Sequence, residues 1–379
     1  MSDSSDRSRG WDGYRTFVVE RKEPESETVT SFYLVPEDEG ALAPYRPGQF
    51  LGFALDVPGE PTPVRRTYTI SDSPGAGAHY RLSIKREPPP PDQPGATPGT
   101  SSNYFHDHVA VGTRLQVLAP SGEFYLRDSG GRPVALLSGG VGLTPMISML
   151  NSMVENGAET PVWFVHGVRN GAEHAFGRHV RRLAEAHDNV DAHIIYLEPR
   201  PEDVSGRDYD DAGLITMELL DRLLAGPEGD FYLCGPPPFM KVLYNGLLGW
   251  GVAEDRIFYE FFGPATVLKD DPADAPATTP GPETAIDATD AGTDGSQVTF
   301  AKAGVTVPWD PAKETLLELA EAHGLTPDFS CRSGVCHTCM CRLVSGEVEY
   351  VHDDVFLPDE DDQVLICSSR PKGDVTLDV

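Results

Sequence analysis

Residues 331–339 have the sequence CRSGVCHTC, which is the most informative stretch for the fold of the C-terminal part. Its cysteines have the spacing C-x4-C-x2-C, and 27 residues separate Cys339 from a further cysteine, Cys367. Plant-type [2Fe–2S] clusters take four thiolates in this spacing, three from one tight loop and one from a distant segment. A zinc site is the alternative, although zinc usually takes its cysteines in C-x2-C pairs. We predict a [2Fe–2S] cluster with the ligands Cys331, Cys336, Cys339 and Cys367.

Cys341 stands two residues beyond Cys339, and we expect it to be a small buried side chain and not a ligand. Strand patterns flank a predicted helix at 315–323, so residues 296–379 indicate an α+β domain. From about residue 298 onward the sequence resembles the ferredoxin domain at the C-terminus of bacterial oxygenase reductases. That resemblance implies a β-grasp fold.

The length of 379 residues favours two or three domains. Acidic residues number 59 and basic ones 30, and the formal net charge of −29 excludes binding of nucleic acid or anionic membranes through bulk charge. The acidity fits either a high-salt cytoplasm or a GC-rich genome. No apolar run approaches the roughly 18 residues of a spanning helix. Residues 1–11 lack an apolar signal core, so we expect a cytoplasmic protein without a membrane span.

Five segments are predicted along the chain, beginning with a polar tail at residues 1–13. Short alternating strands with Gly and Pro between them predict an antiparallel β-barrel over residues 14–127. Buried strands that alternate with helices predict an α/β domain with a parallel sheet over residues 128–263. Residues 264–295 are rich in Pro, Ala, Thr and Asp, which predicts an acidic linker before the domain at 296–379.

A flavin site is predicted in the barrel segment. The sequence RRTYTIS, residues 65–71, can supply a cation for a phosphate, a ring for the isoalloxazine and hydroxyls for its edge, although an ordinary half-exposed strand is the alternative. The sequence GTSSN, residues 99–103, opens a short helix whose amides suit a phosphate, with a plain N-cap as the alternative. The predicted flavin-binding residues are Phe50, Arg66, Thr67, Tyr68, Thr69, Lys85, Gly99, Ser101 and Ser102.

These segments together resemble the ferredoxin–NADP reductase superfamily, and most closely the reductase half of flavohaemoglobins. That family has Arg-x-Tyr-Ser, and Thr69 stands here where Ser is usual. The resemblance implies that Arg66 pairs with a flavin phosphate and that Tyr68 packs on the flavin ring. It favours FAD, while the phthalate dioxygenase reductase branch, which has the same domain order, leaves FMN open. The sequence contains no globin segment, so we expect no haem.

Two further segments predict a pyridine-nucleotide site. The sequence LLSGGVGLTPM, residues 136–146, runs from an apolar strand into a helix, and its glycines would let a phosphate approach the helix N-terminus. An ordinary tight turn is the alternative. The sequence YLCGPPPFM, residues 232–240, ends another strand. The cofactor-binding residues predicted in this half are Gly139, Gly140, Gly142, Thr144, Pro145, Gly235, Pro236 and Phe261.

The same resemblance assigns roles near the reacting rings. It places Cys234 beside the nicotinamide, Phe262 over the flavin and Glu260 close to the flavin, and we predict these three as the catalytic residues. For each of them, core packing or a solvated carboxylate is the alternative. His166 and Arg169 fall where the nucleotide could lie. We expect His166 to be structural, and Arg169 leaves both NADH and NADPH open.

Together, the three modules predict an electron path from NADH or NADPH to a flavin, then to the [2Fe–2S] cluster, and then to a protein acceptor such as a terminal oxygenase. The chain would be an NAD(P)H-dependent flavin and iron–sulfur oxidoreductase. Two alternatives stay open: a reductase of a hybrid-cluster or nitrogen-oxide detoxifying protein, and a redox-sensing module without turnover.

Overall fold

The structure is a computed structural model that describes residues 10–89, 95, 98–262, 268, 295–329, 331–351, 355–358 and 360–379. These residues belong to two compact units, Met1–Phe262 and Gly263–Val379. The predicted tail at 1–13 and the predicted linker at 264–295 lie largely outside the described residues. Among the described residues, no helix has both the length and the apolar character needed to cross a membrane.

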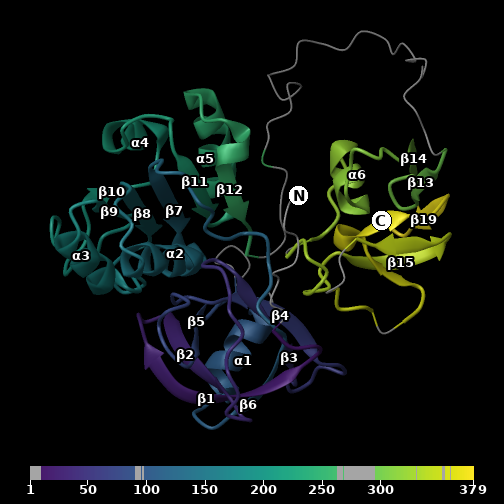
Figure 1. Cartoon of the computed structure of the whole chain (residues 1–379), viewed down its shortest axis with the longest axis horizontal. Helices are drawn as coiled ribbons and strands as arrows, with labels where there is room; N and C mark the ends of the chain where they lie inside the picture. The colour runs from purple at the N-terminus through teal and green to yellow at the C-terminus, as the bar shows by residue number, and fades with distance from the viewer. Residues whose placement is uncertain are drawn as a thin grey trace. The chain divides into compact units, whose positions relative to one another are not determined.

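Six antiparallel strands form the first half of the first unit (Figure 1). They are β1 (Arg15–Pro24), β2 (Val29–Pro36), β3 (Phe50–Leu55), β4 (Val64–Thr69), β5 (Tyr80–Lys85) and β6 (Arg114–Val117). Their order is β4-β3-β6-β1-β2-β5, and a bridge between Ile70 and Leu82 joins the two outer strands. Helix α1 (Thr100–His108) lies within the ring of strands, where Phe105 is fully buried. The predicted antiparallel barrel is confirmed.

Six parallel strands form the second half of this unit. They are β7 (Val134–Gly139), β8 (Val162–Val168), β9 (Val190–Tyr196), β10 (Asp211–Ala212), β11 (Asp230–Cys234) and β12 (Ile257–Glu260). The strand order is β10-β9-β8-β7-β11-β12. Starting from β7, the chain adds β8, β9 and β10 on one side and then β11 and β12 on the other side. In such sheets ligands bind beyond the carboxyl ends of the strands where the direction changes, here between β7 and β11. The predicted α/β domain is confirmed.

The helices of this half are α2 (Leu143–Glu155), α3 (Gly177–Ala186), α4 (Met217–Leu223) and α5 (Pro237–Trp250), and the short turns η1 (Gly140–Gly142) and η2 (Glu254–Arg256) precede α2 and β12. The sequence patterns predict helices over residues 145–155, 176–186 and 217–225, which correspond to α2, α3 and α4, and they predict no helix at α5. Prolines are tolerated in a first helical turn, where the missing N–H would have no partner anyway.

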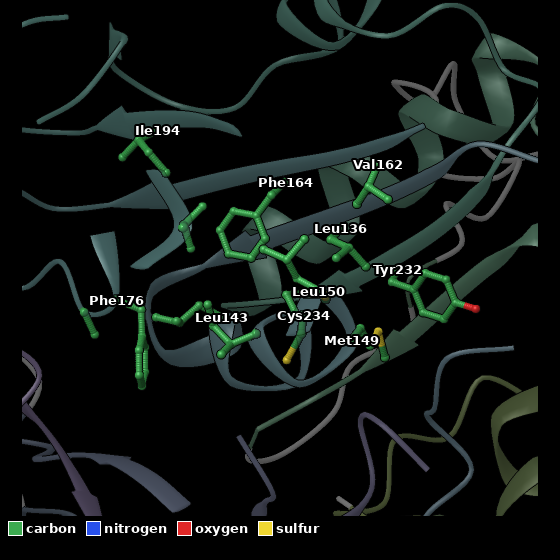
Figure 2. Packing of buried hydrophobic residues seen from close by; sticks show 14 of the residues in the cluster. Leu136, Leu143, Met149, Leu150, Val162, Phe164, Phe176, Ile194, Tyr232 and Cys234 are labelled. Carbon is green, nitrogen blue, oxygen red and sulfur yellow. The ribbon is translucent and has the colours of Figure 1, made fainter. Parts of the chain in front are cut away.

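Figure 2 shows the core that α2 shares with the sheet, with Leu143, Met149 and Leu150 beside Leu136 and Phe164.

The second unit combines a mixed sheet with one helix. Its elements are β13 (Gln297–Phe300), β14 (Val305–Pro308), α6 (Leu316–Ala322), β15 (Met340–Ser345), β16 (Val348–Tyr350), β17 (Gln363–Leu365), η4 (Ile366–Ser368), β18 (Ser369–Pro371) and β19 (Val375–Leu377). The main sheet has the order β14-β13-β19-β15-β17, and β16 pairs with β18. Thr315 caps α6 by accepting the Glu318 N–H, and the apolar face of α6 packs on the core. The predicted α+β domain is confirmed.

Candidate functional site

The two predicted flavin segments meet in the structure. Tyr68 on β4 is half-buried against the rings of Phe53 and Phe105, at centroid distances of 5.9 and 5.0 Å. Burial raises the pKa of the Tyr68 phenol to about 12, and a hydrogen bond with Ser101 in the first turn of α1 opposes that rise. The end of β4 and the start of α1 therefore lie side by side.

Arg66, two residues before Tyr68, is an exposed cation. Its Nη1 donates to the Arg65 carbonyl at 2.7 Å, and no carboxylate pairs with it among the residues that the structure describes. A guanidinium without a carboxylate can accept an anionic ligand through charge-assisted hydrogen bonds. Lys85 differs, because its Nζ lies 3.4 Å from a Glu87 carboxylate oxygen.

The remaining predicted residues of the barrel strands lie deeper. Thr67 is half-buried and Thr69 is buried. Phe50 is 3% exposed, and its ring lies directly beneath Gly122, where a Cβ atom would come within 2.7 Å of it. Phe50 therefore lies side by side with Thr69 of the neighbouring strand, and its ring is covered by the turn at Gly122.

The start of α1 carries polar groups that are available to bind a ligand. No side chain caps this helix, so N–H groups of its first turn lack intrahelical partners. Asn103 Nδ2 donates to the Glu87 carbonyl at 3.0 Å, while Asn103 Oδ1 is buried without a partner in the described chain. A Cβ atom at Gly99 would lie 2.6 Å from Ser102 Oγ, so glycine keeps this approach clear. With Arg66, these groups fit a phosphate-bearing flavin.

Two glycine turns face each other beyond the carboxyl ends of β7 and β11. A Cβ atom at Gly142 would lie 2.2 Å from the carbonyl oxygen of Cys234, and one at Gly235 would lie 2.6 Å from the ring of Phe239. A Cβ atom at Gly139 would lie 3.0 Å from Pro236. Both predicted nucleotide segments therefore come together at the place where the strand order changes direction.

The N-terminus of α2 opens directly onto these turns. Gly140 has a φ of +56°, a left-handed conformation that glycine adopts without a steric cost. Thr144 Oγ1 donates to the Val141 carbonyl at 3.2 Å, and Pro145 is buried in the first helical turn. The Leu143 N–H donates to carbonyls of η1, and no side chain caps α2, so the positive end of the helix dipole remains open to a phosphate.

Cys234 is the innermost of the three residues predicted to be catalytic. It is 0% exposed, and Figure 2 shows it among the buried side chains of the core. Burial, with a smaller contribution from Glu260, raises the pKa of this thiol well above its usual value. Glu260 stands opposite Cys234 in the register of β11 and β12. Cys234 is therefore a neutral thiol at neutral pH.

The two phenylalanines after β12 differ in exposure. Phe261 is 6% exposed, and its ring meets that of Tyr259 edge-on at 5.8 Å. Phe262, which the superfamily resemblance places over a flavin, is 44% exposed. An aromatic side chain open to this extent is available to cover a ligand, whereas Phe261 supports the strand end from within.

His166 is buried at 1% exposure, and its Nδ1 lies 2.9 Å from Ser138 Oγ. Burial and the neighbouring His174 lower the pKa of His166 to about 3, so its imidazole is neutral. This environment agrees with the structural role expected for His166. Sequence reasoning did not find Ser138, whose only signal is a small polar residue at the end of an apolar strand. Arg169 is exposed, with its Nε 3.7 Å from Glu173.

The four predicted cluster ligands converge in the second unit. The Cys331 N–H donates to Cys336 Sγ at 3.4 Å, and the Cys336 N–H donates to Cys331 Sγ at 3.3 Å. A hydrogen bond with the Cys331 sulfur raises the pKa of the Cys336 thiol. Hydrogen bonds with Cys331 and then Cys339 raise the pKa of the Cys367 thiol. Four thiols in mutual contact fit a cluster site with four cysteine ligands.

Local geometry separates these four from Cys341. Gly334 has a φ of +71°, and a Cβ atom there would lie 2.8 Å from Ser368 Oγ, so glycine lets the loop rest on the turn that carries Cys367. Cys341 packs against the core of the unit, and burial raises its pKa to about 12. Among the described residues, no group of three or more His, Cys, Asp or Glu side chains is arranged so that it could hold a single metal ion. A [2Fe–2S] cluster divides its four thiolates between two irons.

Three family models match the chain in succession. They are an oxidoreductase FAD-binding domain over residues 16–125, an oxidoreductase NAD-binding domain over residues 136–244 and a 2Fe-2S iron–sulfur cluster binding domain over residues 298–372. The cofactor domains predicted from the sequence are thereby confirmed.

The chain is also similar to curated proteins named flavohemoprotein. It is 42% identical over 266 residues to that of Halalkalibacterium halodurans, with 70% of this chain and 64% of the relative covered. It is 44% identical over 261 residues to that of Rhizobium meliloti, with 69% of this chain and 63% of the relative covered. The chain thus spans just under two thirds of the length of these relatives.

Two solved structures extend the comparison. The flavohem-like FAD/NAD binding domain of nitric oxide dioxygenase from Vibrio cholerae is 36% identical, with a TM-score of 0.58, and the match covers 66% of this chain and 100% of that one. Phthalate dioxygenase reductase is 23% identical, with a TM-score of 0.55, and the match covers 97% of this chain and 98% of that one. The second likeness shows a shared three-domain fold.

Proposed function

The chain belongs to the ferredoxin–NADP reductase superfamily, and from this we propose that it passes electrons from NAD(P)H through FAD to a [2Fe–2S] cluster and on to a protein acceptor. One observation carries the proposal: an FAD-binding, an NAD-binding and a [2Fe–2S]-binding domain follow one another in a single chain. When bound, the nucleotide supplies an electron pair, the flavin divides it, and the cluster carries single electrons.

The residues of the first unit would bind and orient these groups. We propose that Arg66 and the open N–H groups of α1 hold the flavin phosphates, while Tyr68 packs on the ring. The glycine turns at β7 and β11 would admit the nucleotide phosphates to the N-terminus of α2. Cys234 would line the nicotinamide site as a neutral thiol, and the exposed Phe262 would exclude water from the flavin.

In the second unit, Cys331, Cys336, Cys339 and Cys367 would hold the cluster. We propose a terminal oxygenase as the acceptor, supported by the shared three-domain fold with phthalate dioxygenase reductase. We also propose a cytoplasmic location, because the cytosol keeps thiols reduced and so leaves the four ligand cysteines available to a cluster.

An assay on the purified protein tests the proposal. The protein should release FAD on denaturation, reduce ferricyanide and cytochrome c with NADH or NADPH, and show iron–sulfur absorbance. Arg66→Ala should lose flavin on dialysis, because the phosphate would lose a charge-assisted bond worth about 1.5–3 kcal/mol. The matched control is Arg114→Ala, an exposed arginine of the same barrel that pairs with Glu37. A wild-type protein that binds no flavin would refute the function.

A further inference from the structure

Helix α2 carries a second set of polar contacts, away from its N-terminal glycine turn. Ser148, Asn151 and Glu155 lie three and four residues apart, so they share one face of the helix. The opposite, apolar face packs into the core with the sheet (Figure 2). The polar face meets the segment Ser71–Ser73, which directly follows the strand of Arg66 and Tyr68.

Asp72 is the centre of this contact. Its main-chain oxygen accepts from Ser148 Oγ at 2.6 Å and from Tyr45 OH at 2.8 Å. Its carboxylate accepts from Asn151 Nδ2 at 3.2 Å and lies 3.5 Å from Arg81 Nη2. One residue on, Ser73 Oγ donates to Glu155 Oε2 at 2.5 Å.

The centre of the contact is enclosed and held from a third side, whereas Asp72 is half-buried and Glu155 at the edge is exposed. Ser148 is 0% exposed, Asn151 7% and Ser73 2%. His179 on α3 lies with its Nε2 2.6 Å from Asn151 Oδ1, so both ends of the Asn151 amide are engaged. Because a hydrogen bond in such a dry place has no water to replace it, its loss leaves a buried group unsatisfied. This clasp, defined as Asp72 and Ser73 with Ser148, Asn151 and Glu155, is therefore a geometrically specific joint.

We propose that the clasp fixes the distance between the flavin-binding strand and the nucleotide-binding turn, and that Asn151 is its positioning residue. A helix rises about 1.5 Å per residue, so α2 is a rigid spacer of roughly 10 Å between Thr144 and Asn151. One end of the spacer carries the glycine turn and the other holds the residues that follow Tyr68. The clasp positions the two cofactor-binding segments and does not itself bind a cofactor, since none of its side chains is among the predicted cofactor-binding residues.

This inference rests on the proposed function and refines it. Misplacing two reacting groups by about 1 Å can slow a reaction about 100-fold without changing the affinity for either partner. Asn151→Leu in the full-length holoprotein should therefore lower the stopped-flow rate of flavin reduction by NADH about 10- to 100-fold. Its KM for NADH should stay within about threefold, and the long-wavelength charge-transfer absorbance of the reduced protein with NAD⁺ should fall.

Two further variants guard against a simple folding defect. Ser148→Ala removes one bond of the clasp with little change in volume and should show the same effects in weaker form. The exchange Asp72→Asn with Asn151→Asp keeps an amide facing a carboxylate but moves the charge from Arg81 to His179, so it should recover part of the rate that Asn151→Leu loses. Asn156→Leu is the control, because Asn156 caps the C-terminus of the same helix outside the clasp and its side chain donates to Ser152.

The outcomes separate this inference from the function itself. If the wild-type protein is not reduced by NADH or NADPH, the function fails and the clasp proposal with it. If the wild type is reduced normally and Asn151→Leu, with full flavin content, matches its rate and its charge-transfer band, the clasp proposal alone is wrong. A raised KM with an unchanged reduction rate would also overturn it, because Asn151 would then support nucleotide binding.

Discussion

At the scale of single residues, the cysteines of the second unit form two groups, which differ in what their sulfur atoms contact. Cys331, Cys336, Cys339 and Cys367 interact with one another through their sulfurs, whereas Cys341 is half-buried and packs against the core. Cys336→Ser should therefore abolish the visible iron–sulfur absorbance, while Cys341→Ser should leave both absorbance and iron content unchanged. Spectra of the two purified variants check this, and loss of the cluster from the Cys341 variant would contradict the ligand assignment.

His166 makes the first unit sensitive to acid. Its pKa is lowered to about 3 by burial and by His174, against an ordinary value of 6.5. A histidine that is neutral when folded but protonates when unfolded stabilises the fold above the unfolded pKa, and this contribution is lost as pH falls. Between pH 7 and pH 5 the loss should be about 2 kcal/mol. Urea unfolding at both values measures it, and His166→Gln should lessen the dependence.

At the scale of elements, the meeting of η1 with the end of β11 depends on a missing side chain. A Cβ atom at Gly142 would collide with the Cys234 carbonyl, so Gly142→Ala must push the start of α2 away from β11. We expect at least a tenfold weaker affinity for NAD⁺, measured by titration of flavin absorbance.

Gly249→Ala is the control for that substitution. Gly249 lies within α5, and a Cβ atom there would meet nothing within 4 Å. Alanine is the better helix former, so this variant should keep its NAD⁺ affinity and gain up to about 1 kcal/mol of stability. Equal affinities for the two variants would show that the close approach of η1 to β11 does not matter for binding.

At the scale of the whole molecule, the division into two units predicts separable activities. The barrel and the parallel sheet share the unit Met1–Phe262, and the four cluster cysteines belong to the other unit. A protein ending at residue 262 should keep NADH-to-ferricyanide activity and lose most of its reduction of cytochrome c. Steady-state rates of both proteins measure this, and equal cytochrome c rates would refute a path through the cluster.

The amino-acid sequence was enough to identify the three domain types, and it predicts the cluster ligands. Local patterns sufficed, because strand alternation, glycine turns and the spacing Cys331 to Cys339 each reflect constraints within a few residues. Sequence reasoning also predicts Arg66 and Ser101 in one flavin site, from their residue types and from the resemblance to a known superfamily. It missed α5, which begins directly after β11 with prolines in its first turn.

The contacts that join the barrel to the parallel-sheet domain are visible in the tertiary structure alone. Asp72 and Asn151 are ordinary polar residues in sequence, and 79 positions separate them along the chain. The same holds for the approach of Gly142 to Cys234 and for the burial of Phe50 under Gly122. Such contacts join residues that are far apart in the sequence, and no local period or motif encodes their approach. Their physical cause is close packing, which makes each buried polar group and each missing Cβ atom depend on a distant partner.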